Sequence, residues 1–252
     1  MKLGLISDVH GNWQALKVAL DLFREQEKVD KLLNCGDVVG YGPEPGRCVE
    51  AMVDFPAISV RGNHDAGLLG DLGLDFFNDA AKEALNWTRD KLNSRNQGYL
   101  DGLPEERYLE EFDVSMVHGS SVNPLTHYIA GKREAFQSLR KAGSDFNLQI
   151  FGHTHLPALY EVNDNNVKQY ETGAGREFTF EAGKQYLVNP GGVGQPRDGN
   201  WKTSFAVLEL GDKREPQKVK FYRKEYPAEL TRQKILDAGL PKRLGDRLLR
   251  GR

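Results

Sequence analysis

Residues 148–155, LQIFGHTH, join an apolar, strand-like run to two histidines that stand two positions apart. Side chains at positions i and i+2 of an extended chain point to the same side. If the extended conformation continues past Phe151, the rings of His153 and His155 can reach one place. The chain has 6 histidines, and all except His127 follow a strand-like run. We therefore expect the strands to bring these ends together at a two-metal site.

Ligand-type side chains follow four other apolar runs in the same way. Such runs cover residues 3–6, 29–35, 57–60 and 114–117. In open α/β sheets, the carboxyl ends of the strands line one crevice in which ligands bind. The groups expected to meet there, together with His153 and His155, are Asp8, His10, Asp37, Asn63, His64 and His118.

Two carboxylates, an amide oxygen and several imidazoles form a mixed nitrogen and oxygen ligand set. Such a set suits Mn²⁺, Fe²⁺, Zn²⁺ or Ni²⁺, and the lack of a cysteine in it argues against a structural zinc site. Asp37 stands alone on its loop and is predicted to bridge the ions. Two ions about 3.5–4 Å apart clamp a phosphoryl group and lower the pKa of a bound water, which gives a hydroxide nucleophile. A histidine can then protonate the leaving oxygen.

The order of the predicted elements indicates the fold class. Up to residue 65 the pattern is strand, helix, strand, which is typical of a largely parallel sheet. From residue 158 onward, short strand-like segments with turn residues between them indicate a mostly antiparallel half. Two mixed β-sheets packed face to face, with helices outside, accommodate both halves. We predict one domain over residues 1–252, with a helical insertion around residues 66–105 and a C-terminal helical tail over residues 228–252, whose basic residues form a solvated face.

Composition narrows the classes of partner. The chain has 252 residues and a formal net charge of -2, so no strong field favours nucleic acid or an anionic membrane. No apolar run approaches the roughly 20 residues of a membrane-spanning helix. Asp8 interrupts the first apolar run too early for a signal peptide, and Cys35 and Cys48 are expected to be free thiols. These features predict a cytoplasmic protein with no membrane partner.

The ordered motifs resemble those of the calcineurin-like metallophosphoesterase superfamily. Similarity extends from Asp8 to His155 and continues weakly into residues 189–192. Within the superfamily, the chain is most similar to small bacterial and archaeal phosphoesterases, including some that cleave dinucleoside polyphosphates. The motifs that carry this resemblance are Asp8-Val9-His10, Gly36-Asp37, Gly62-Asn63-His64-Asp65, His118 and Gly152-His153-Thr154-His155.

The resemblance implies a four-layer α/β/β/α sandwich with a dinuclear centre. His64 would be the general acid for the leaving group and would not bind metal. We expect two divalent ions per chain, with Mn²⁺ preferred and Fe, Zn, Ni or Mg as alternatives. By the family's pattern, one ion would take Asp8, His10, Asp37 and His155, and the other would take Asp37, Asn63, His118 and His153.

One departure from the family bears on the substrate. Serine/threonine phosphatases of this superfamily carry an Asp-Arg pair where this chain has Gly40 and Tyr41, which argues against a protein phosphatase of that type. The glycine-rich segment 189–197 can approach a phosphate through its backbone N–H groups, and Arg197 can supply the missing cation. We name Arg197, Tyr41 and His127 as candidate substrate-binding residues, the last with its neighbour Tyr128.

The sequence leaves more than one function open. The leading hypothesis is a phosphohydrolase that acts on a small phosphorylated substrate: a phosphomonoester, a phosphodiester or a nucleotide. A dinucleoside polyphosphate hydrolase is an alternative within this class. A non-catalytic, metal-binding scaffold for protein interaction is an alternative of another class, and the presence of His64 argues against it. A nuclease is disfavoured because the chain has no long basic stripe. The oligomeric state is left open.

Overall fold

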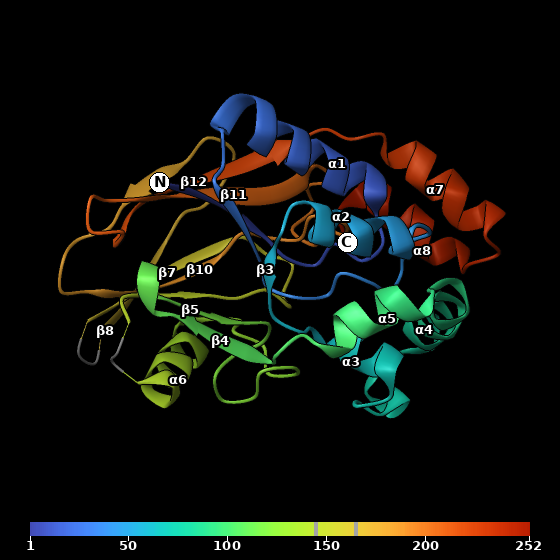
Figure 1. Cartoon of the computed structure of the whole chain (residues 1–252), viewed down its shortest axis with the longest axis horizontal. Coiled ribbons are helices and arrows are strands. Elements are labelled where there is room, and N and C mark those ends of the chain that lie inside the picture. Colours follow the sequence, from blue (N-terminus) through green and yellow to red (C-terminus); the bar gives the residue numbers. More distant parts are fainter. Residues whose placement is uncertain (144–145, 164–165) are drawn as a thin grey trace.

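The computed structural model describes residues 1–143, 146–163 and 166–252. Within these ranges the chain forms two mixed β-sheets of six strands each. The sheets pack face to face and helices cover their outer faces, as Figure 1 shows. The predicted four-layer α/β/β/α sandwich is thereby confirmed.

The first sheet has a parallel half and an antiparallel half. The β1 strand pairs in parallel with β2 and antiparallel with β11, so that Leu5 lies opposite Leu33 on one side and Ala206 on the other. Across the sheet the order is β3 (Ile58–Ser59), β2 (Lys31–Asn34), β1 (Lys2–Ile6), β11 (Thr203–Leu210), β12 (Pro216–Lys224) and β9 (Glu177–Thr179).

The second sheet is also mixed, and its three parallel strands lie at the centre. The central strands β5, β6 and β10 run in parallel, and antiparallel strands flank them. Across the sheet the order is β4 (Glu106–Leu109), β5 (Val114–Val117), β6 (Leu148–Ile150), β10 (Gln185–Asn189), β7 (Ala158–Asn163) and β8 (Asn166–Tyr170).

Strand alternation divides the apolar side chains between separate cores. Along β11, Phe205 and Val207 face the helices, whereas Ala206 and Leu208 face the second sheet. This is the two-residue period of a strand that is buried on both faces. The inner faces of the two sheets thus share one core, and each outer face packs against helices.

The outer helices are amphipathic. On the first sheet, Leu16 and Val49 belong to the same buried cluster as Phe205, while Leu139 packs on the outer face of the second sheet. Figure 1 shows these helices on opposite sides of the sandwich. They are α1 (Trp13–Leu22) with the π-helical turn η1 (Phe23–Glu27), α2 (Pro45–Asp54) and α7 (Ala228–Asp237) on the first sheet, and α6 (Lys132–Ala142) on the second.

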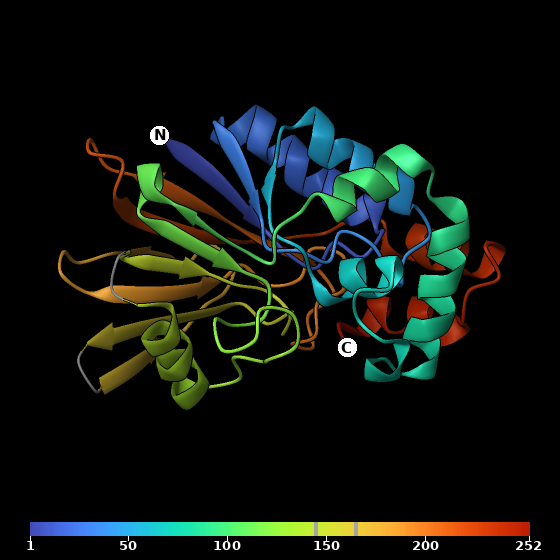
Figure 2. The same ribbon diagram turned by 60° about the horizontal axis from the view of Figure 1, so that its bottom comes forward.

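Further helices gather at one end of the sandwich, beyond the carboxyl ends of β1 and β2. Figure 2 shows the teal and green helices of residues 63–101 and the red C-terminal segment at this end. The elements here are α3 (Asn63–Leu69), η2 (Leu74–Phe76), α4 (Asp79–Lys91), α5 (Ser94–Asp101), α8 (Lys242–Asp246) and η4 (Leu248–Arg250).

A few boundaries differ from the sequence prediction. The strand expected from Val29 begins at Lys31, because Lys28 ends the preceding helix in a left-handed conformation. The β4 strand ends at Leu109, where the turn η3 (Glu110–Phe112) begins. The β8 strand was missed because it is mostly polar and exposed. In the part of the chain that the structure describes, every helix is too short or too polar to cross a membrane.

Candidate metal centre

The polar residues that follow β1, β2, β5 and β6 meet at one end of the sandwich, together with Asn63 and His64 at the start of α3. Backbone hydrogen bonds hold the connecting loops against each other. Asp8 N–H donates to Gly36 O at 3.1 Å, and Gly152 N–H donates to His118 O at 2.8 Å. The strand ends therefore converge, as the sequence predicts.

Left-handed backbone conformations set the directions in which these side chains point. Asp8, His10, Asp37, His153 and His155 all have φ between 50° and 64°, a region that non-glycine residues seldom occupy and that is concentrated at functional sites. The extended conformation considered for residues 151–155 does not occur, since β6 ends at Ile150. Turns, and not strand alternation, thus direct the two histidines of the GHTH segment.

A first cluster contains Asp8, His10 and His155. His155 Nε2 lies 3.2 Å from His10 Nε2 and 3.3 Å from Asp8 Oδ1. The Nδ1 atoms of both rings face backbone oxygens: Val39 O at 3.1 Å for His10 and Gln195 O at 2.6 Å for His155. Because a carbonyl only accepts hydrogen bonds, both Nδ1 atoms carry the proton and both Nε2 lone pairs point at each other.

This first cluster fits a cation. Two facing lone pairs repel, and a cation between them removes the repulsion. Both carboxylate oxygens of Asp8 are buried and, in the described part of the chain, make no hydrogen bond of normal geometry. Burial raises the pKa of Asp8 to about 7. Burial also lowers the pKa of His10 and of His155, which keeps the imidazoles in the neutral form that binds metals.

A second cluster is centred on His118. Its Nδ1 donates to Cys35 O at 2.7 Å. Its Nε2 atom lies 3.0 Å from Asn63 Oδ1 and 3.1 Å from His153 Nδ1. Two imidazole nitrogens and an amide oxygen this close together are ligand types that suit a divalent ion. His153 therefore belongs to a different cluster from His155, although the two stand only two positions apart.

Asp37 lies between the two clusters. Its Oδ2 is 3.6 Å from His10 Nε2 and 3.5 Å from His118 Nε2, so one oxygen is within reach of both groups. Its Oδ1 accepts the backbone N–H of His64 at 2.8 Å. Burial raises the pKa of Asp37 well above its ordinary value, a cost that cations on both sides would remove.

Asp65 supports the loop that carries Asp37. Its carboxylate accepts backbone N–H groups from Gly62 at 3.0 Å, Asp37 at 2.9 Å and Val39 at 3.2 Å. Asp65 thus ties the loop of Asp37 to the loop that precedes α3.

Replacing Asp65 with alanine is expected to lower the free energy of unfolding by about 3 kcal/mol, because three buried N–H groups lose a charged acceptor. Urea unfolding of the metal-free protein measures this change. Asp90→Ala is the matched control, since Asp90 is an exposed carboxylate of α4 and should change stability by less than about 0.5 kcal/mol. Equal effects of the two replacements would contradict the role of Asp65.

His64 faces the centre from the side of α3. Its ring packs against Tyr41 at 4.5 Å, His10 at 4.8 Å and Phe77 at 5.0 Å between centroids. Its buried Nδ1 has no hydrogen-bond partner in the described part of the chain. Burial lowers the pKa of His64.

The structure also explains why the Asp-Arg pair of the resembling phosphatases is absent. Gly40 has φ +96°, and a Cβ added there would lie 2.5 Å from His64 Nδ1. The His64 ring thus fills the space that an aspartate at position 40 would need. At position 41 the tyrosine ring has the guanidinium carbon of Arg197 6.0 Å from its centroid, so a cation reaches this point from another loop.

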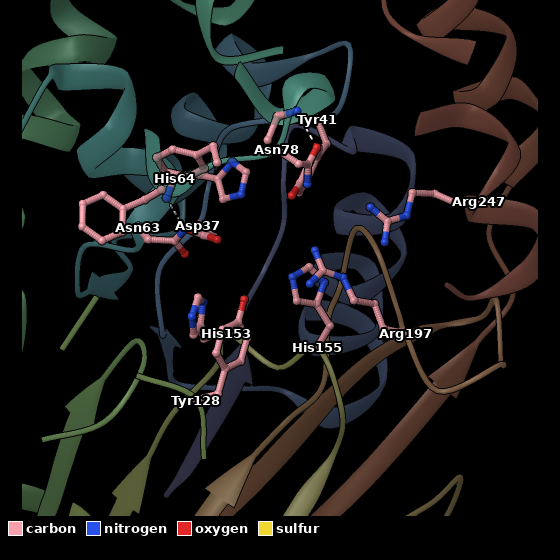
Figure 3. A pocket seen from close by; sticks show the side chains of 13 residues that line it. Asp37, Tyr41, Asn63, His64, Asn78, Tyr128, His153, His155, Arg197 and Arg247 are labelled. Carbon is pink, nitrogen blue, oxygen red and sulfur yellow. Dashed lines mark hydrogen bonds between the residues drawn. The ribbon is translucent and has the colours of Figure 1, made fainter. Parts of the chain in front are cut away.

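The two clusters open into a cavity of about 160 Å³. Figure 3 shows Asp37, Asn63, His64, His153 and His155 around this space. Tyr41 and Arg197, named from the sequence, also line it. Sequence reasoning did not find five further lining residues, which are Phe76, Phe77, Asn78, Ala81 and Arg247.

His127 does not line this cavity. Its Nδ1 is 2.7 Å from Ser120 Oγ, within the loop that follows β5. Its neighbour Tyr128 does line the cavity and stacks on His153, with 3.8 Å between ring centroids. The substrate-binding role considered for His127 stays a prediction.

Comparison with known proteins decides the family. The family model described as the calcineurin-like phosphoesterase superfamily domain matches residues 1–213. The chain belongs to that superfamily. It is a metallophosphoesterase, a phosphoric ester hydrolase, and membership implies divalent metal ions that the clusters described above could hold.

Two similar proteins match over nearly their whole length. The phosphoesterase is 36% identical to a metallophosphoesterase from Sphaerobacter thermophilus, whose crystal structure superposes with a TM-score of 0.84 over 100% of this chain and 99% of that one. It is 34% identical to an uncharacterized protein of Methanocaldococcus jannaschii over 99% of this chain and 98% of that protein.

Two weaker similarities add detail. A hypothetical protein from Pyrococcus horikoshii shares the fold, with a TM-score of 0.78 at 20% identity over 100% of this chain and 98% of that one. A symmetrical bis(5′-nucleosyl)-tetraphosphatase of Psychromonas ingrahamii is 28% identical over 66% of this chain and 61% of that protein.

Proposed function

We propose that this phosphoesterase is a dinuclear-metal-dependent phosphohydrolase of the cytoplasm, with His64 as its general acid. The observation that carries the proposal is the position of Asp37. One oxygen of this carboxylate lies within about 3.6 Å of an imidazole nitrogen in each of two metal-type clusters. The same cavity contains His64, whose ring lies within 4.8 Å of ligand atoms of His10 and Asp37; we assign it the role of proton donor and not of ligand.

The seven proposed ligands divide into two sets that share Asp37. When bound, two divalent ions would supply Lewis-acid polarisation of the phosphoryl oxygens and a water of lowered pKa. Nitrogen and oxygen ligands without a thiolate suit Mn²⁺ first, with Fe, Zn, Ni or Mg as alternatives. One set is Asp8, His10, Asp37 and His155, and the other is Asp37, Asn63, His118 and His153.

The remaining polar groups of the cavity would bind and orient the substrate. His64 would donate a proton to the leaving oxygen, and its packing between Tyr41 and Phe77 fixes the ring for that task. Arg197 would neutralise charge on the phosphoryl group. Its guanidinium donates to Gln195 Oε1 at 2.9 Å, and this hydrogen bond holds it in place. Gln195 in turn binds the His155 ring through its backbone oxygen.

A substrate panel tests the proposal. It contains a mono-aryl phosphate, a bis-aryl phosphate and diadenosine tetraphosphate, each assayed with several divalent metals. We expect metal-dependent hydrolysis of at least one of them. The tetraphosphate is included because the Psychromonas ingrahamii relative carries a tetraphosphatase name. No hydrolysis of any class by metal-loaded protein would overturn the proposal and favour the non-catalytic scaffold.

The two histidines of the GHTH segment are expected to hold different ions. His155 lies with Asp8 and His10, whereas His153 lies with His118 and Asn63. His155→Ala should therefore empty the metal position beside Asp8, and His153→Ala should empty the position beside Asn63. Anomalous difference maps of Mn²⁺-soaked crystals of each variant locate the remaining ion. The same ion missing from both variants would contradict the division.

A further inference from the structure

The C-terminal segment places Arg247 in the cavity. Arg247 lies between α8 and η4 and lines the same space as Asp37 and His64. The buried neighbours Leu244 and Leu248 hold this segment on the core. The prediction that the basic residues of 228–252 form a solvated face is therefore wrong for Arg247, although it holds for the exposed Arg250.

Arg247 and Arg197 flank the ring of Tyr41 from two different loops. Their guanidinium carbons lie 5.8 Å and 6.0 Å from the Tyr41 centroid, respectively. Burial, and then the charge of Arg197, lower the pKa of Arg247. Two partly buried cations thus share one wall of the cavity.

Neither arginine forms an ion pair with a carboxylate side chain in the described part of the chain. The guanidinium of Arg197 donates to Gln195 Oε1, and Arg247 donates through Nε to the backbone oxygen of Arg252. The Tyr41 hydroxyl is a further hydrogen-bond partner of both guanidinium groups. Arg197 is attracted to the carboxylates of Asp8 and Asp37, whereas its charge disfavours that of Arg247. An anionic ligand beside Arg247 relieves this repulsion. Arginine forks match phosphate in charge and geometry.

The two arginines enter the cavity at different points. In Figure 3, Arg197 lies beside His155 and Arg247 lies farther from Asp37, with both guanidinium groups directed into the cavity. A phosphoryl group bound over Asp37 would therefore have Arg197 next to it and Arg247 beyond. A substrate with a single phosphate would leave Arg247 without an anion.

We infer that Arg247, with Arg197, forms a subsite for a second phosphate group, so that the preferred substrates carry two or more phosphates in a row, as nucleotide anhydrides do. The inference rests on the proposed function and deepens it, because it names the substrate class of the same site. Arg247 is then a specificity-determining residue that binds the leaving phosphate.

The reaction on such a substrate balances as a hydrolysis. The oxygen of a water molecule bonds to the phosphorus over Asp37, and the bridging bond from that phosphorus to the oxygen of the leaving phosphate breaks. His64 gives its proton to that leaving oxygen. One proton of the water then restores His64, and the other stays with the products. Arg247 would stabilise the charge on the leaving phosphate throughout.

The test compares two nucleoside substrates that differ in the number of phosphates. One is the p-nitrophenyl ester of thymidine 5′-monophosphate, with a single phosphate, and the other is diadenosine tetraphosphate. In metal-loaded wild-type protein we expect a higher kcat/KM for the tetraphosphate. In Arg247→Gln the kcat/KM for the tetraphosphate, divided by that for the ester, should fall at least about 10-fold. The change should come mainly from a higher KM for the tetraphosphate, as the loss of charge-assisted hydrogen bonds predicts.

Two further variants distinguish the loss of phosphate binding from a structural effect of the substitution. Arg247→Lys keeps the charge but loses the fork, and should lower the ratio by less. Arg250→Gln removes an exposed arginine three residues away that does not line the cavity, and should leave both substrates unaffected. Thermal unfolding of Arg247→Gln and Arg247→Lys shows whether each variant is folded.

Three results would overturn the inference, and they differ from one another. An equal loss on both substrates in Arg247→Gln would mean that Arg247 only supports the cavity. A wild-type protein that cleaves the single-phosphate ester but not the tetraphosphate would retain the proposed function and refute the subsite. If metal-loaded wild-type protein cleaves neither substrate nor any member of the aryl phosphate panel, the proposed function fails as well.

Discussion

Replacing His64 with alanine is expected to lower kcat at least about 100-fold while the metal ions stay bound, a loss typical of general acid–base catalysis. The ring of His64 lines the cavity, and its buried Nδ1 makes no hydrogen bond in the described part of the chain. That Nδ1 lies against Gly40, so Nε2 is the ring nitrogen left to face the substrate. Metal analysis of the purified variant, together with its hydrolysis rate, measures both parts of the prediction.

A comparison of two esters with different leaving groups makes this test more specific. A general acid matters most when the departing oxygen is strongly basic, so the loss in His64→Ala should be larger for an alkyl phosphate ester than for a p-nitrophenyl ester. An equal loss on both esters would indicate that His64 only holds the phosphate. A variant as fast as wild type would remove His64 from the mechanism.

Replacing Asp37 with asparagine is expected to disrupt both metal positions at once. Asp37 Oδ2 lies 3.6 Å from His10 Nε2 and 3.5 Å from His118 Nε2, and an asparagine removes the charge that would balance the two ions. Since two bound ions contribute several kcal/mol to the reaction, the rate should fall by about three orders of magnitude. Bound metal and the rate of ester hydrolysis are the measurements.

A matched carboxylate separates this effect from a general change of charge. Asp90→Asn alters an exposed aspartate of α4 and should leave both metal content and rate unchanged. The asparagine at position 37 can still accept the backbone N–H of His64, so the loop should stay folded. An Asp37→Asn protein that holds two ions at full rate would refute the bridging role.

Residue type and spacing were enough to predict the sandwich and the residues that meet at its end. Carboxyl ends of parallel strands share one edge of a sheet, so Asp8 and Asp37 had to converge once the strands were recognised. His118 follows a strand of the second sheet and joins them because the two sheets pack face to face. The backbone that aims them was not predictable. Left-handed turns at His153 and His155 depend on contacts between loops, which local sequence patterns do not encode.

Contacts remote in sequence account for what the prediction missed at the cavity. Arg247 stands 50 residues after Arg197 in the chain, and it reaches the cavity because Leu244 and Leu248 bury themselves in the core. An interleaved run of leucines and basic residues is equally typical of a solvated helix face. The α3 helix was also missed, because Gly62 and Asn63 favour turns in isolation.

The central claim is that hydrolysis requires two ions, one on each side of Asp37. Titrating metal-free protein with Mn²⁺ tests it most directly, if bound metal and the rate of phosphate ester hydrolysis are measured in the same samples. The account predicts little rate with one ion bound per chain and the full rate when two are bound. A full rate with one ion or none, or no hydrolysis with two, would contradict it.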